Sequence, residues 1–154
     1  MNAPRPSRNR RNPAQAQRGV AAVEFAIIAS LLFTLLIGIM EMGRLLWTWN
    51  AAAESTRLGA RLAVVCSIGD ANIKTRMRQM LPALDNGNIA IDYLNPPFAA
   101  NSCTTDNCKQ VRVRLSGHVH QTIIPFLPLS VTLPPFQTTL PREYMDSTGN
   151  SVCN

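Results

Sequence analysis

The sequence lacks the residue patterns that most enzyme sites require. It holds only two histidines, and its nine carboxylates show no paired spacing for acid–base chemistry. It contains no G-x-S-x-G segment, no H-E-x-x-H segment and no phosphate-binding glycine loop. Its four cysteines form no C-x-x-C pair, the usual knuckle of a structural zinc site. We therefore expect no enzymatic activity, no catalytic residues, no metal and no cofactor.

An excess of positive charge is also missing beyond the first residues. The formal net charge is +6, from 15 Lys+Arg and 9 Asp+Glu. Five arginines precede Val20, which leaves ten basic against nine acidic residues after Gly19. Residues 1–19, rich in Pro, Asn and Gln, are interpreted as a disordered basic leader. An arginine-rich arm for nucleic acid is the alternative, but the segment that follows favours a membrane, so we expect no nucleic-acid partner.

The stretch from Val20 to Met40 is apolar, with Glu24 as its only charge. As a helix it would cover roughly 30 Å, the hydrocarbon thickness of a bilayer. Trp47 and Trp49 follow two turns later, which suits an aromatic belt at the headgroups. The arginines before the span place the N-terminus in the cytoplasm. A cleaved secretory signal is disfavoured because the run is long and has no small-residue cleavage site. An uncleaved anchor leaves Glu24 unexplained.

The residues around Glu24 carry a family resemblance. A basic leader ends at Gly19, a glutamate follows five residues later, and Phe25 comes directly after it. This pattern resembles a type IV pilin-like signal. The core "AVEFA" and the later "AAAESTRLGARLAV" are most similar to TadE-like minor pseudopilins of the tight-adherence (Flp) pilus system. The likeness is specific from about Arg18 to Val65 and looser beyond it.

The resemblance implies a role in assembling a pilus that supports surface attachment and biofilm formation. A prepilin peptidase would cut between Gly19 and Val20, and Glu24 would then pair with the new amine of Val20 on the same or an adjacent chain. A glutamate that reaches water at the membrane surface is the alternative. The partners implied are the peptidase, other pilin and pseudopilin subunits and the assembly platform. The location implied is the bacterial inner membrane, single-pass, with an extracytoplasmic C-terminal domain. A permanently anchored binding module and a type II secretion minor pseudopilin are the rival functions.

The remaining sequence predicts a small α+β domain. The transmembrane helix, residues 20–47, is expected to continue into a domain of residues 48–154, and Gly59 weakens the helix enough to allow a bend there. A second helix is predicted from 71 to 85 after an N-cap at Asp70. Apolar residues then alternate in 89–93 and in 111–119, which predicts antiparallel strands. A third candidate strand contains Pro134 and Pro135, which place it at an edge or split it.

The cysteines and histidines of this domain allow further predictions. Cys103 and Cys108 bracket a polar turn, and Cys66 and Cys153 can join the long helix to the C-terminal segment, although four cysteines allow three pairings. Outside the cytoplasm, disulfides are the expected state. His118 and His120 lie two apart on a predicted strand and can share a metal, but no third ligand is near. We expect a solvated strand face there.

Overall fold

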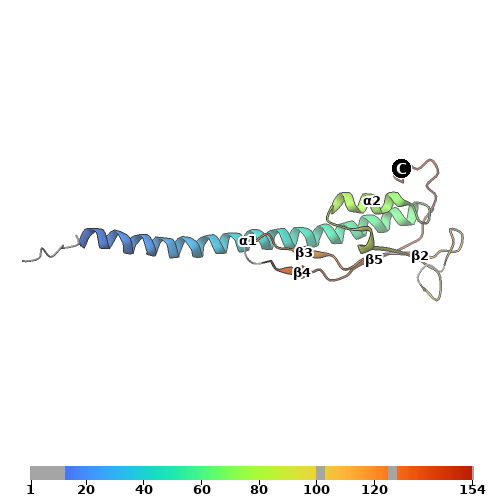
Figure 1. Ribbon diagram of the computed structural model, residues 1–154. Coiled ribbons are helices and arrows are strands. Elements are labelled where there is room, and N and C mark those ends of the chain that lie inside the picture. Colours follow the sequence, from blue (N-terminus) through green and yellow to red (C-terminus); the bar gives the residue numbers. More distant parts are fainter. Residues whose placement is uncertain (1–12, 100–102, 125–127, 154) are drawn as a thin grey trace, which may run out of the picture. The chain divides into compact units, whose positions relative to one another are not determined.

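The computed structural model describes residues 13–99, 103–124 and 128–153 (Figure 1). The chain divides into two compact units, residues 1–40 and residues 41–154. The elements are α1 (Pro13–Val65), α2 (Ala71–Met80), the 3-10 turn η1 (Asn86–Asn88), β1 (Ile89–Leu94), β2 (Gln110–Leu115), β3 (Val119–Gln121), β4 (Ser130–Thr132) and β5 (Phe136–Pro141). This order confirms the predicted α+β class, with a long apolar N-terminal helix, a second helix and antiparallel sheets.

In the first unit, α1 carries the apolar run. The helix is long and apolar enough to cross a membrane. Its most apolar stretch of 18 residues is not covered by any part of the chain that the structure describes. Side chains along it are open on all sides; Phe25 is 73% exposed and Leu31 is 72% exposed. An apolar surface of this kind is unfavourable in water, which makes lipid or other helices its natural surroundings.

In the second unit, small residues let α1 pack closely. Ala52, Ala60 and Ala63 are fully buried there. A Cβ at Gly59 would overlap the Sδ atom of Met77 on α2, so this glycine permits close contact between α1 and α2. Helix α1 continues through Gly59 without a break and ends at Val65.

Helix α2 begins and ends where local chemistry requires. The Asp70 side chain accepts a hydrogen bond from the backbone N–H of Asn72 at 2.9 Å, which confirms the predicted N-cap. The helix ends at Met80, five residues earlier than expected. Leu81 precedes Pro82, and a residue before proline is driven out of helical geometry.

The strands form two antiparallel sheets, one of order β1-β2-β5 and one of β3-β4. In the larger sheet Ile91 lies opposite Val113, and Val113 lies opposite Thr138. Three inward side chains of β2, those of Val111, Val113 and Leu115, are fully buried in the same core as α1 and α2. The alternation predicted from the sequence therefore identifies the correct face of this sheet.

Two breaks divide the segments that the sequence presents as continuous. Gly117 adopts φ +70°, a conformation that glycine reaches at little cost, and it separates β2 from β3. The prediction of one strand through Val119 is therefore wrong. Pro134 and Pro135 separate β4 from β5, which is the split that was one of the two expected outcomes.

Candidate functional site

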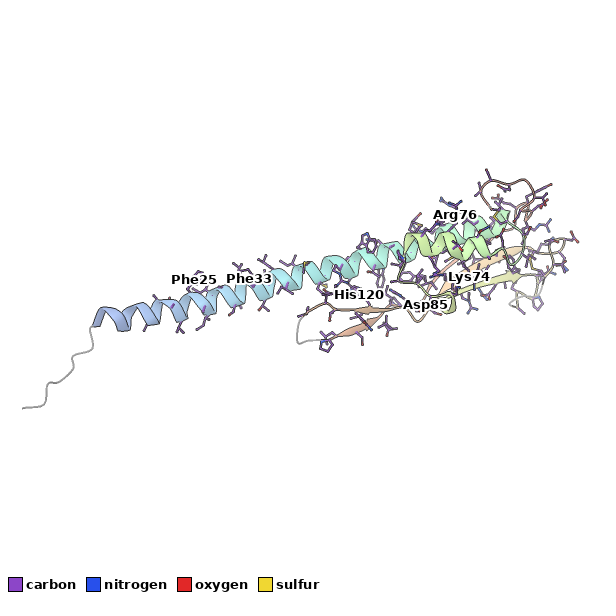
Figure 2. The ribbon with its side chains drawn as sticks, turned by 45° about the horizontal axis from the view of Figure 1, so that its top comes forward. Phe25, Phe33, Lys74, Arg76, Asp85 and His120 are labelled. Atoms are coloured by element: carbon purple, nitrogen blue, oxygen red, sulfur yellow. A yellow bond between two sulfur atoms is a disulfide. The ribbon has the colours of Figure 1, made fainter. Side chains whose placement is uncertain are left out.

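The N-terminal residues singled out from the sequence all lie on the exposed surface of α1. Val20 is 69% exposed and Glu24 is also exposed. Figure 2 shows Phe25 and Phe33 on this part of the helix. Glu24 makes no hydrogen bond or ion pair with another residue in the described ranges. A carboxylate in an apolar helix requires a partner or access to water, and the described residues supply no partner for Glu24.

Val20 and Glu24 are four residues apart on the same helix. This spacing places them on one face, with their Cβ atoms about 5–6 Å apart. Cutting the Gly19–Val20 bond would create a positively charged amine within reach of this carboxylate. The same amine could equally meet Glu24 of a neighbouring helix. The pair between Glu24 and a Val20 amine therefore requires that the chain has been cut.

A comparison with protein families matches this same region. The model described as "TadE-like protein" matches residues 19–61, which all lie in α1. The resemblance to TadE-like proteins that the sequence motif indicated is confirmed over this segment. No curated protein and no solved structure matches the chain. The match supports membrane association and a place in a tight-adherence pilus system.

A second group of polar side chains lies in the second unit, around Glu41. The Nη1 atom of Arg44 lies 2.8 and 2.9 Å from the two carboxylate oxygens of Glu41, and the two residues form an ion pair. The Nε2 atom of His120 lies 3.1 Å from Glu41 Oε1. A carboxylate only accepts hydrogen bonds, so this nitrogen carries the proton. On the other side of the ring, Nδ1 lies 3.4 Å from the Thr48 hydroxyl. The imidazole thus connects β3 to α1.

The expectation that both histidines are solvated on a strand face is wrong. His118 and His120 are each 6% exposed, and His118 precedes β3 instead of lying in it. The reason is tertiary: α1 supplies a carboxylate and a hydroxyl for His120, and these lie more than seventy residues away in sequence. Sequence spacing gives no sign of this contact.

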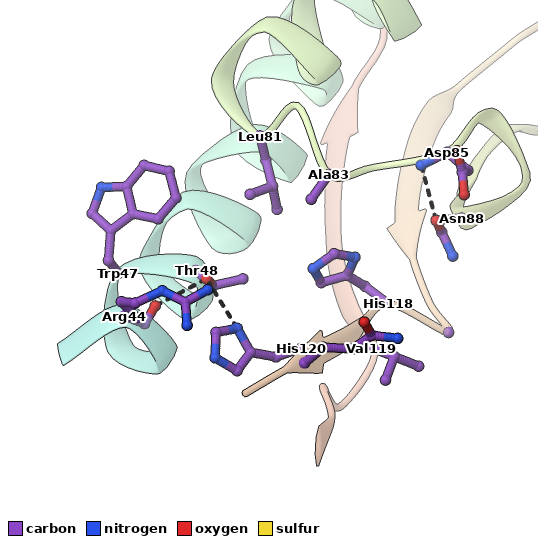
Figure 3. A pocket seen from close by; sticks show the side chains of 12 residues that line it. Arg44, Trp47, Thr48, Leu81, Ala83, Asp85, Asn88, His118, Val119 and His120 are labelled. Atoms are coloured by element: carbon purple, nitrogen blue, oxygen red, sulfur yellow. Dashed lines mark hydrogen bonds between the residues drawn. The ribbon is translucent and has the colours of Figure 1, made fainter. Parts of the chain in front are cut away.

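The two histidines line a cavity of about 540 Å³ (Figure 3). Its walls come from α1, from the segment between α2 and β1, and from residues 117–121. Burial, followed by the neighbouring His120, lowers the pKa of the His118 ring, and Asp85 opposes this only in part. His118 is therefore held in its neutral form near neutral pH.

This burial predicts a loss of stability in acid. The unfolded His118 ring takes up a proton near pH 6.5, whereas the folded ring, with its lowered pKa, does so only at lower pH. The free energy of unfolding should therefore fall as the pH drops below about 6.5, by at most about 1.4 kcal/mol per pH unit from this group. Urea titrations of the full chain in detergent at several pH values would measure it. A His118→Gln variant should lose this part of the pH dependence; an unchanged slope would contradict the prediction.

The structure joins all four cysteines in disulfides, Cys66 with Cys153 and Cys103 with Cys108. This is one of the three pairings that the sequence allows. In the described residues, the one group with metal-ligand spacing is Cys66, Asp70 and Cys153. Both of its sulfurs belong to one disulfide, so the group offers no thiolate to an ion.

Asp92 is a buried ion-pairing residue that the sequence patterns did not single out. Its carboxylate lies 3.2 Å from Nε of Arg112 and 2.8 Å from Nε of Arg114, and the residue is 4% exposed. Asp92 and Arg112 are direct partners across β1 and β2. Opposite charges at facing positions of two alternating strands are the signal that could have indicated this pair.

Proposed function

We propose that the chain is a minor pseudopilin that takes part in assembling a tight-adherence (Flp-type) pilus, and so supports surface attachment and biofilm formation. The observation that carries the proposal is the placement of Gly19, Val20, Glu24 and Phe25 at the start of an exposed apolar helix, inside the TadE-like match. The role is structural, with the chain acting as a substrate of a prepilin peptidase rather than as an enzyme.

The proposed location is the bacterial inner membrane, with the N-terminus in the cytoplasm and residues 48–154 outside it. Arginines in the leader support this orientation. Two disulfides in the second unit suit an oxidising compartment. Other pilin and pseudopilin subunits and the assembly platform are the proposed partners, since a helix that is open on all sides offers them a packing surface.

In this proposal, Glu24 sets the register between neighbouring helices by pairing with a Val20 amine. Polar contacts between helices in membranes contribute roughly 0.6–2 kcal/mol. Removing one should weaken association about three- to thirtyfold. The apolar contacts supply the rest of the binding energy, so insertion into the membrane does not need the carboxylate.

The test is Glu24→Ala in the cell that makes the protein. We expect normal membrane insertion, measured by fractionation, and fewer fibres or less of this subunit in them. Glu54→Ala is the matched control, because Glu54 is also a carboxylate of α1 but lies in the second unit beside Arg57, at 3.4 Å. The control should assemble normally. Full piliation by the Glu24→Ala strain would count against the assembly role.

A further inference from the structure

The β3–β4 hairpin exposes apolar side chains at its end. Ile123 is 68% exposed and Leu129 is 51% exposed. Thr122 and Leu129 hold the two arms together, with the Thr122 backbone N–H donating to the Leu129 carbonyl at 3.0 Å and the Leu129 N–H donating to the Thr122 hydroxyl at 3.0 Å. We call Ile123 and Leu129 the hairpin tip. The two arms are thus paired beside the hairpin tip, and its side chains are open to the surroundings.

The sequence around the hairpin tip carries no charge. Between His120 and Arg142 there is no Asp, Glu, Lys or Arg, although charged residues make up 16% of the chain. Edges and ends of exposed strands normally carry charge, which keeps them soluble and prevents their association. An uncharged end with exposed aliphatic side chains is therefore a candidate contact surface.

Contacts to Glu41 fix the level of the tip along α1. The Nε2 atom of His120 lies 3.1 Å from the Glu41 carboxylate, and Ile123 follows His120 by three residues, with its backbone near the same carboxylate. Glu41 directly follows Met40, the last residue of the apolar run. The tip is thus attached to the residue at which α1 is expected to leave the hydrocarbon.

An exposed tryptophan follows farther along the same helix. Trp47 lies six residues beyond Glu41, about 9 Å along the helix, and is 61% exposed. The headgroup layer on each side of a bilayer is roughly 5–8 Å thick. Glu41 and the hairpin tip therefore lie at the depth at which short apolar groups meet lipid, and Trp47 lies just beyond the outer limit of that layer.

We propose that the hairpin tip rests on the bilayer that α1 crosses, with Ile123 and Leu129 in its headgroup layer. This inference rests on the membrane insertion in the proposed function. The contact is shallow, because backbone polar groups near lipid have to stay hydrated or paired. It gives the external unit a second attachment to the membrane beside α1.

The test places a single label at each position in the full chain. Ile123→Cys and Leu129→Cys variants carry a polarity-sensitive fluorophore, since the native cysteines are in disulfides. Tyr144→Cys is the matched control: Tyr144 is 78% exposed, and its neighbour Glu143 binds the Val64 carbonyl, at the far end of α1 from Glu41. Leu32→Cys, within the apolar run, reports insertion itself. The proteins are placed in vesicles of phosphatidylethanolamine and phosphatidylglycerol that contain a spin-labelled quencher lipid.

We expect blue-shifted emission and several-fold stronger quenching at 123 and 129 than at 144, together with strong quenching at 32. If the labels at 123 and 129 show the same emission wavelength and the same weak quenching as the label at 144, while the label at 32 is quenched, the tip contact would be overturned and the membrane span would stay intact. An unquenched label at 32 would instead overturn the insertion on which both proposals rest. A response at 123 that grows with protein density and ignores the quencher would indicate a second copy in place of lipid, and would also overturn the inference.

Discussion

Replacing Gly19 by leucine should leave the protein untrimmed. We expect the Gly19→Leu chain to keep its leader, to migrate more slowly on gels than the wild type, and to yield an N-terminal sequence that does not begin at Val20. A Cβ at position 19 would meet nothing within 4 Å among the described residues. Leucine is also a better helix former than glycine. Neither packing nor helix stability can therefore explain a loss of processing, which leaves recognition by the peptidase.

Gly38→Leu is the control for this variant. Gly38 belongs to the same helix, and a Cβ there also meets nothing within 4 Å among the described residues. The chemical change and its open surroundings are the same, but position 38 is far from the proposed cut. We expect this control to be trimmed normally. Identical mobility of the Gly19→Leu chain and the trimmed wild type would refute cleavage after Gly19, and a wild-type chain that starts at Met1 or Asn2 would favour a permanently anchored binding module.

Removing the Cys66–Cys153 disulfide should cost the second unit much of its stability. The bond links residues 87 apart, and closing a loop of that length lowers the entropy of the unfolded chain by an amount worth about 4–5 kcal/mol. Small domains are typically stable by roughly 5–15 kcal/mol. We expect a Cys66→Ser/Cys153→Ser chain to unfold at much lower urea, or to be degraded in the cell. Trp49 packs edge-to-face on Phe136, with 5.2 Å between the ring centroids, so the fluorescence of Trp49 should change when this contact is lost on unfolding.

Cys103→Ser/Cys108→Ser is the matched comparison. This pair closes a loop with a separation of only five residues, for which the same relation gives about 2 kcal/mol. The double variant should therefore unfold closer to the wild type than the Cys66→Ser/Cys153→Ser chain does. Equal losses for the two variants would show that loop entropy does not determine the contribution of these bonds.

Features of the fold that depend on residues close in sequence could be predicted, and features that depend on distant residues could not. Local signals are sufficient for the α2 cap at Asp70 and for the inward face of β2, because each depends on residues within a few positions. The strand break at Gly117 is not predictable in this way. A glycine can adopt negative or positive φ, so its presence in the sequence does not reveal the φ of +70° that ends β2 here. The end of α2 is predicted too late, despite Pro82, because the apolar period continues past that proline.

The two candidate sites differ in the same way. Gly19, Glu24 and Phe25 form a pattern within one short segment, so the amino-acid sequence is enough to recognise them. His120 cannot be assigned from sequence, since its alternation on a strand is the same whether the ring faces water or Glu41. Only the packing of β3 on α1 brings the ring to the carboxylate, and no short-range pattern encodes that packing.

Helix α1 belongs to both units of the chain, and this determines where the external domain can be separated from the apolar segment. The helix supplies apolar surface up to Met40, and from Glu41 onward it supplies a wall of the external core, including Ala52 and Ala63. A fragment that starts at residue 41 would keep that wall and the carboxylate that His120 binds. One that starts after Trp47 would keep the Thr48 hydroxyl but lose the Glu41 carboxylate that His120 binds. A water-soluble version of the domain therefore has to be cut inside a continuous helix, at the peptide bond between Met40 and Glu41.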